Sequence, residues 1–228
     1  TQSTPLTHTC PIEITKKGRK EMEQVSSSRT AVSLKRTQPT LEQQRESFKQ
    51  NRFIAMPLAG TIVWAILGAS APFVSELTIT WMLYIGTGAI FYLGAGLSYL
   101  TGERFFAKKA TSNSFDRLFF VGMLMSLLVF AIALPVAAID HTTVSLSIGI
   151  LAGLMWMPLS WAIEHWVGYF HTIARTFGIV GAWYLFPDAR VEAISAVIVS
   201  VYIVSLIALE RRFQTCNVKK RANAQMSI

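Results

Sequence analysis

The chain has 228 residues, of which 52% are hydrophobic and only 15% are charged, and its formal net charge is +8. Soluble domains carry about a quarter of their residues as charges, so this composition excludes an ordinary water-soluble fold and predicts a protein that resides in lipid. The positive charge does not indicate nucleic-acid binding, because no recognisable binding module surrounds the basic residues.

The first part of the chain, residues 1–39, is polar. It mixes Ser, Thr, Lys, Arg and Pro without helical or strand periodicity, and such a segment cannot bury enough apolar surface to offset its chain entropy. We therefore predict a disordered tail. Cys10 in this segment and Cys216 near the other end lack metal-ligand or CxxC spacing, so no role is predicted for either.

A helix is predicted to begin at Thr40. Thr40 and Gln43, three residues later, fit a capping box, in which each side chain satisfies a free backbone N–H of the other residue. The apolar run that follows starts near Phe53, which is too far from the N-terminus for a cleaved secretory signal. We therefore expect one helix that runs from Thr40 into a first membrane span.

The remainder of the chain divides into apolar segments of membrane-spanning length. About 20 helical residues cross a hydrocarbon core of about 30 Å. The 144–186 run would be about 64 Å long as one helix, so it predicts two crossings with a turn at Glu164–His165 or near Gly168. The fold class predicted is an all-α bundle of about six transmembrane helices in a domain from 40 to 212, followed by a basic tail from 213 to 228. The expected spans are 53–75, 79–100, 118–139, two within 144–186, and 191–209.

The orientation of these spans follows from their basic flanks, because Lys and Arg in short flanks stay on the cytoplasmic side. Ten Lys or Arg residues precede residue 53, four lie in 101–117 and five follow residue 209, whereas the opposite side has only Arg190. Six spans place the three basic segments on one side. Both termini are therefore predicted to be cytoplasmic.

Small residues predict close helix packing. Gly149 and Gly153 form a GxxxG pattern in the fourth span, and Gly88 and Gly96 share one face of the second. These positions fit either contacts within the monomer or a homo-oligomer interface. We favour the monomer, because a six-span bundle has many internal interfaces.

Ionisable side chains enter an apolar segment in one place, 164–175. If that segment is one helix, Glu164, His171 and Arg175 lie on a single stripe. Arg175 would then lie near the middle of the bilayer, where a charge is costly and normally faces a partner or a hydrated cavity. The alternative is that Arg175 snorkels toward the headgroups while Glu164 lies in water. The sequence leaves both open.

Signatures of catalysis are lacking. His165 and His171 are six residues apart and so lie well off one another's helix face, unlike the histidines of an HExxH zinc site. Serine-nucleophile, phosphate-loop and dinucleotide motifs are absent from the sequence. We therefore predict no catalytic residue, no metal and no cofactor.

A family resemblance extends over about Leu41 to Arg212. The segments that carry it are RFIAMPLAGTIVW (52–64), LYIGTGAIFYL (83–93), GILAGLMWMPLSW (149–161), HWVGYFHTIARTF (165–177) and AWYLFPDAR (182–190). Over this range the chain resembles a family of small bacterial integral membrane proteins that has no assigned function. The resemblance implies a multi-pass protein of the bacterial cytoplasmic membrane, with residues 1–39 outside the family domain, and it implies no activity.

Two functional hypotheses follow. In the first, the protein binds or moves a small or lipid-like molecule, with an anionic group as the natural ligand, in an intramembrane cavity near Glu164, His171 and Arg175. In the second, it is a non-catalytic structural or accessory subunit whose polar stripe pairs internally or with a partner helix. A membrane enzyme ranks third. The surroundings of Arg175 distinguish the first two.

Overall fold

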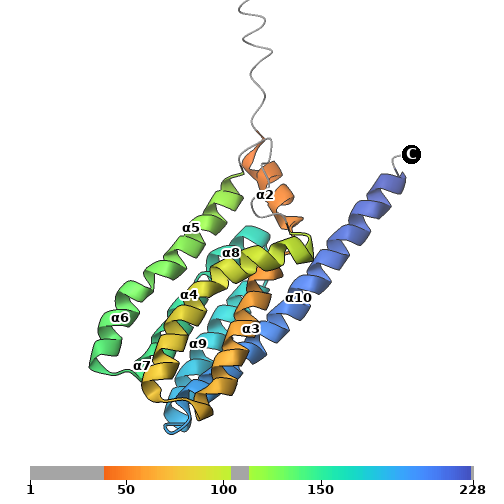
Figure 1. Cartoon of the computed structure of the whole chain (residues 1–228). Helices are drawn as coiled ribbons and strands as arrows, with labels where there is room; N and C mark the ends of the chain where they lie inside the picture. Colours follow the sequence, from red (N-terminus) through yellow and green to blue (C-terminus); the bar gives the residue numbers. More distant parts are fainter. Residues whose placement is uncertain (1–38, 104–112, 227–228) are drawn as a thin grey trace, which may run out of the picture. The chain divides into compact units, whose positions relative to one another are not determined.

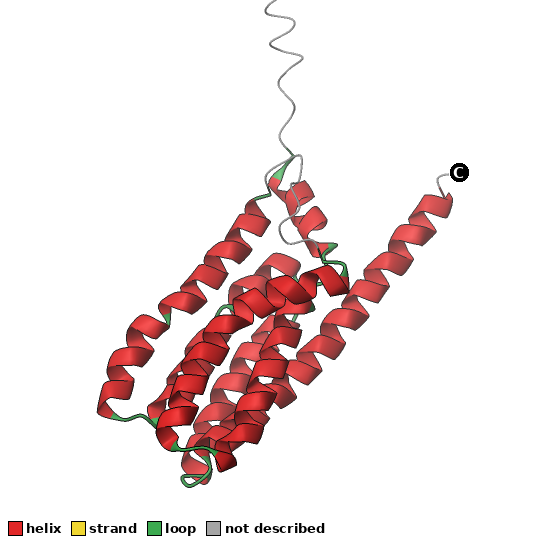
Figure 2. Cartoon of the chain, in the orientation of Figure 1, coloured by secondary structure: helices red, strands yellow, loops and turns green. Residues whose placement is uncertain are grey.

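The computed structural model describes residues 39–103 and 113–226, and within these ranges it is helical without a strand (Figure 2). The tail predicted at 1–39 therefore lies outside the described residues except for its last position. The helices are α2 (Leu41–Lys49), α3 (Ala55–Ser70), the 3-10 turn η1 (Ala71–Phe73), α4 (Glu76–Thr101), α5 (Ser114–Leu128), α6 (Phe130–Ile139), α7 (Thr143–Gly153), α8 (Trp156–Ile163), α9 (Val167–Leu185) and α10 (Arg190–Met226).

Five helical segments are long and apolar enough to cross a membrane. The helix pairs α5–α6 and α7–α8 each form one of these segments, because only a short irregularity separates the two members. This confirms the all-helical, multi-span fold predicted from composition. The five segments are Ala55–Phe73, Glu76–Thr101, Ser114–Ile139, Thr143–Ile163 and Arg190–Val218.

Helix α9 is not among those five segments, yet it also runs the length of the bundle (Figure 1). It follows Glu164, which binds Arg45 of α2. It ends at Leu185. Shortly after it, Arg190 donates to Thr142 (2.9 Å), which lies at the end of the bundle opposite to Glu164. The chain thus passes six times between the two ends of the bundle, as the charge pattern predicts, although α9 is less apolar than the other five segments.

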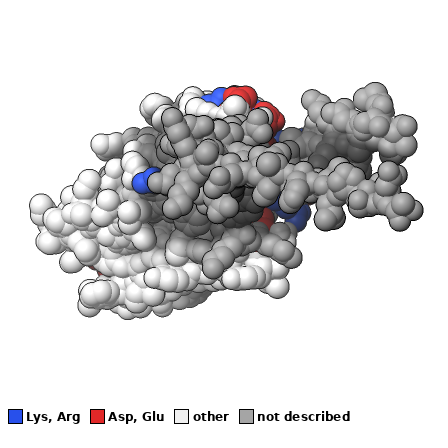
Figure 3. Space-filling view, turned by 90° about the horizontal axis from the view of Figure 1, so that it is seen from above, with Lys and Arg blue, Asp and Glu red and all other residues white. Residues whose placement is uncertain are grey.

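Charged residues meet at one end of the bundle. Arg52 pairs with Glu210 (2.9 Å), and Arg212 donates to the backbone oxygen of Lys49 (2.9 Å). In the view of Figure 3, most of the atoms that are not grey are white, which marks residues other than Lys, Arg, Asp and Glu. We call this end of the bundle the charged end. Its residues are Arg45, Lys49, Arg52, Glu103, Glu164, Glu210 and Arg212.

The prediction of one continuous helix from Thr40 into the first span is wrong. Helix α2 ends at Lys49 and α3 begins at Ala55. The carboxylate of Glu103, at the end of α4, accepts the backbone N–H groups of Ile54 (2.6 Å) and Ala55 (3.2 Å). A negative group at this position satisfies free donors and stabilises the positive end of the helix dipole, so α3 starts here and α2 packs separately against α5 and α8.

The predicted turn between the fourth and fifth crossings is confirmed. Glu164 ends α8 in a left-handed conformation (φ 49°), and α9 starts at Val167. Gly168 permits the tight approach of the two helices, because a Cβ there would lie 2.2 Å from the backbone oxygen of Trp156. At the other end of the chain, α10 continues to Met226, so the segment predicted as a basic tail extends the last helix.

The glycines of the fourth crossing pack within the monomer. A Cβ at Gly149 would lie 2.9 Å from Ile179 of α9, and one at Gly153 would lie 2.9 Å from Cδ of Arg175. The favoured explanation of this GxxxG pattern therefore agrees with the geometry. Gly88 and Gly96 instead face open space, so a homo-oligomer contact through α4 stays a prediction.

Candidate functional site

Arg175 lies in the interior of the bundle, near the middle of α9, with 1% of its surface exposed. Its Nε donates to the carbonyl oxygen of Gly149 on α7 (2.7 Å). Its Nη1 donates to the hydroxyl of Tyr202 on α10 (3.2 Å) and lies 3.4 Å from Nε2 of His171. The guanidinium therefore connects α9 to α7 and α10 in the interior of the bundle.

His171 is fully buried one turn before Arg175 and stacks on the ring of Trp156, with 3.9 Å between ring centroids. Its Nδ1 lies 2.9 Å from the hydroxyl of Ser205. That hydroxyl donates its single proton to the carbonyl of Val201, so it accepts from Nδ1–H of the imidazole. Nε2 is then left as an acceptor that faces Arg175.

The positive charge of Arg175 has no carboxylate partner among the residues that the structure describes. Its Nη2 also has no hydrogen-bond acceptor within that part of the chain. The aromatic rings of Tyr202 and Trp64 lie 5.4 and 5.8 Å from Cζ and provide weak cation–π stabilisation. A buried guanidinium with an open pair of donors is the arrangement that an anion would complete.

Glu164 lies apart from this pair. It precedes α9, and its carboxylate accepts from Arg45 (2.7 Å) and contacts Lys49 at the charged end. The left-handed backbone at Glu164 interrupts the helix on which the predicted stripe depended. Of the three predicted site residues, the structure brings together His171 and Arg175.

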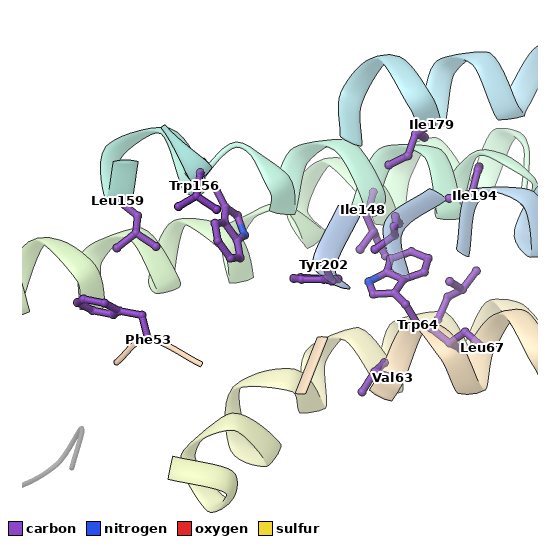
Figure 4. Packing of buried hydrophobic residues seen from close by; sticks show 14 of the residues in the cluster. Phe53, Val63, Trp64, Leu67, Ile148, Trp156, Leu159, Ile179, Ile194 and Tyr202 are labelled. Carbon is purple, nitrogen blue, oxygen red and sulfur yellow. The ribbon is translucent and has the colours of Figure 1, made fainter. Parts of the chain in front are cut away.

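A cavity of about 120 Å³ adjoins Arg175. Its wall comes from α3 to α10 and is mainly aromatic and aliphatic; Figure 4 shows Trp64, Ile148 and Tyr202 close together, with Phe53 and Leu159 further along. The hydroxyl of Ser126 has acceptors in the sulfur of Met155 (2.8 Å) and in the carbonyl of Gly122 in its own helix (3.3 Å). Arg175 is the charged residue among those that line the cavity. The wall contains Phe53, Met56, Pro57, Trp64, Thr87, Ile90, Phe91, Phe119, Met123, Ser126, Leu127, Phe130, Ile148, Ala152, Met155, Trp156, Leu159, Arg175 and Tyr202.

Sequence reasoning missed the partners that fix the two site residues. Tyr202 and Ser205 lie within the last span, and Trp64 lies within the first. The available signal was a tyrosine and a serine one turn apart in the middle of an otherwise apolar span, since polar side chains at that depth usually hydrogen-bond across helices.

Comparison with known proteins gives a family and no activity. A model of DUF7010, a family of unknown function, matches residues 41–212. This range agrees with the one predicted from the sequence. Neither the curated proteins nor the solved structures contain a significant match to the chain.

Proposed function

The chain belongs to DUF7010, which has no assigned function, and we propose from the site that the protein binds an anionic, lipid-like molecule in the cavity beside Arg175. The observation that carries the proposal is a buried guanidinium, without a carboxylate partner in the described residues, that lines an otherwise apolar cavity. Charges at such depth are costly and normally mark functional sites.

The two parts of the ligand follow from the two parts of the wall. A carboxylate or phosphate group would accept hydrogen bonds from Nη2 of Arg175, whose planar fork matches such groups. A hydrocarbon part would lie against rings such as Trp64 and Phe91, where it leaves water or lipid for a shaped apolar wall. Gly149, Tyr202 and His171 would hold the guanidinium so that Nη2 points to the ligand.

The second candidate is a structural or accessory subunit without a ligand. It is favoured by the same three hydrogen bonds, which join α7, α9 and α10 and would stabilise the bundle without any ligand. Under this alternative the cavity stays empty, and Arg175 matters for stability alone. Retention of a ligand therefore decides between the two.

The test is native mass spectrometry of the purified full chain with lipid extraction. We expect a co-purifying anionic amphiphile with the unchanged protein and its loss from Arg175→Leu. Arg175→Lys keeps the charge but loses the planar fork, so we expect weaker retention there as well. Arg190→Lys, at the opposite end of the bundle, is the matched control and should retain the ligand.

Thermal unfolding of the same variants provides the second measurement. Arg175→Leu leaves the buried acceptors of Gly149, His171 and Tyr202 without their donor, at about 1–3 kcal/mol for each. If Arg175→Lys matches the unchanged protein in ligand retention and melting temperature, the cavity hypothesis is wrong. If the variants lose stability while no form carries a ligand, the structural alternative holds.

A further inference from the structure

A second cavity, of about 300 Å³, lies at the charged end. Its wall includes Asn51, Arg52 and Glu103, so it is more polar than the cavity beside Arg175. Two residues, Phe53 and Phe119, line both cavities. Their ring centroids are 6.0 Å apart, and the two rings thus form part of the wall between the cavities.

Phe53 has an unusual backbone. It lies between α2 and α3 with φ of 58°, a left-handed conformation that is rare for a bulky residue and persists only where the surroundings enforce it. The residue is 4% exposed, and its ring centroid lies 4.8 Å from that of Phe48. Cζ of Arg212 lies 5.7 Å from the same centroid. Strained residues of this kind concentrate at ligand clamps and switch regions.

The position of the two rings suggests how an anionic group could reach Arg175. A lateral path between α4 and α5, past Leu127 (43% exposed), would take the charge through hydrocarbon, which is costly. At the charged end, Asn51 and Arg52 offer hydrogen-bond donors to the charge as far as the ring pair. The same wall carries two carboxylates, that of Asp116 and that of Glu103, which already accepts the backbone N–H groups at the start of α3. The rings are then the barrier that remains before the cavity of Arg175.

We propose that Phe53 and Phe119 form a gate through which the anionic ligand exchanges between the charged-end cavity and the cavity of Arg175. This inference rests on the proposed function. A gate changes the rates of entry and exit together, whereas a binding residue changes the equilibrium affinity. The rates therefore distinguish the gate from the contacts that hold the ligand.

The experiment measures association and dissociation of a fluorescent long-chain fatty acid with the full chain in nanodiscs. We expect Phe119→Ala to raise both rates about fivefold or more with little change in Kd, and Phe119→Trp to lower both. Leu124→Ala is the matched control on the same helix, because Leu124 is exposed and lines neither cavity, so the rates should stay unchanged. Phe53→Gly removes the other ring at a position where glycine suits the backbone, and it should also raise both rates.

Each result has a definite meaning. Equal rates for Phe119→Ala and Leu124→Ala would overturn the gate. Exchange that slows in Leu127→Trp but not in Phe119→Trp would also overturn it, in favour of a lateral path. If the unchanged protein binds no fatty acid saturably and Arg175→Leu behaves identically, the proposed function itself fails.

Discussion

At the residue scale, the absence of a side chain at Gly153 leaves room for Arg175. A Cβ at Gly153 would lie 2.9 Å from Cδ and 3.2 Å from Nε of Arg175. The absent side chain lets the stem of Arg175 lie against α7, from where Nε reaches the carbonyl of Gly149. The GxxxG pattern therefore serves the placement of a charge as well as the approach of two helices.

Gly153→Ala should displace Arg175 and lower both the melting temperature and ligand retention. An added methyl group in a packed interior typically costs about 1–3 kcal/mol. Gly181→Ala is the control, since a Cβ at Gly181 meets nothing within 4 Å and alanine is favoured over glycine within a helix by about 1 kcal/mol. Thermal unfolding and native mass spectrometry measure both effects. Unchanged ligand retention in Gly153→Ala would show that Arg175 does not depend on this contact.

From the sequence, only the site residues that lie close together on one helix could be predicted. Arg175 and His171 could be found because ionisable residues are rare in apolar spans and these two are one helical turn apart. Glu164 was predicted to lie on the same stripe, because the sequence has no glycine or proline at this position to indicate a helix end. The left-handed backbone of Glu164, which ends α8, could therefore not be predicted. Tyr202 and Trp64 could not be assigned, because their role depends on which helices become neighbours.

At the scale of elements, α2 is the helix whose position owes most to electrostatics. Arg45 and Lys49 both bind the carboxylate of Glu164, while Phe48 is buried against Phe53. The pKa of Glu164 is lowered chiefly by the hydrogen bond from Lys49, against a smaller opposing effect of desolvation. A carboxyl with a lowered pKa stabilises the folded form above its ordinary pKa, and this contribution is lost as the pH falls through the lowered value.

Glu164→Gln should loosen α2 without disrupting the bundle. We expect faster amide hydrogen exchange in residues 41–49, and the same change in the unchanged protein at acidic pH or at high salt, because salt screens exposed ion pairs. Glu46→Gln is the control: Glu46 pairs with Lys49 inside α2 and does not tie α2 to the bundle. Equal exchange in the two variants would mean that apolar contacts alone hold α2.

The break between α2 and α3 shows where element prediction from the sequence stops. The helix that begins after Thr40 and the first span were both predicted, because a polar segment whose sequence fits a capping box precedes an apolar run. The end of α2 at Lys49 was not found, because the carboxylate that caps α3 belongs to Glu103 in a distant part of the chain. Tertiary contacts of this kind have no local signal.

At the scale of the whole molecule, the same two residues form the candidate site and make α9 less hydrophobic than the other five passes. His171 and Arg175 make this pass less apolar than the other five, and both lie in the interior, where α7, α8 and α10 surround them. A helix with buried polar groups is stabilised in a bilayer by its neighbours, which satisfy those groups. Composition alone therefore finds five membrane-spanning segments, although the chain passes six times between the two ends of the bundle.

The number of crossings determines on which side of the membrane Asp188 lies. With six crossings and a cytoplasmic N-terminus, the turns at Asp140 and Asp188 are both external, and the C-terminus is cytoplasmic. If α9 did not cross, Asp188 would lie on the same side as Glu164, and the C-terminus would be external.

The test uses full-length Asp140→Cys and Asp188→Cys, each in a background with Cys10→Ser and Cys216→Ser. Intact cells are labelled with a membrane-impermeant maleimide. We expect both to react, and Ser114→Cys, the internal control, to react only after the membrane is permeabilised. If Asp140→Cys reacts and Asp188→Cys does not, α9 does not cross the membrane. Arg175 would then not lie in the middle of the bilayer, and the proposed role of Arg175 would lose its basis.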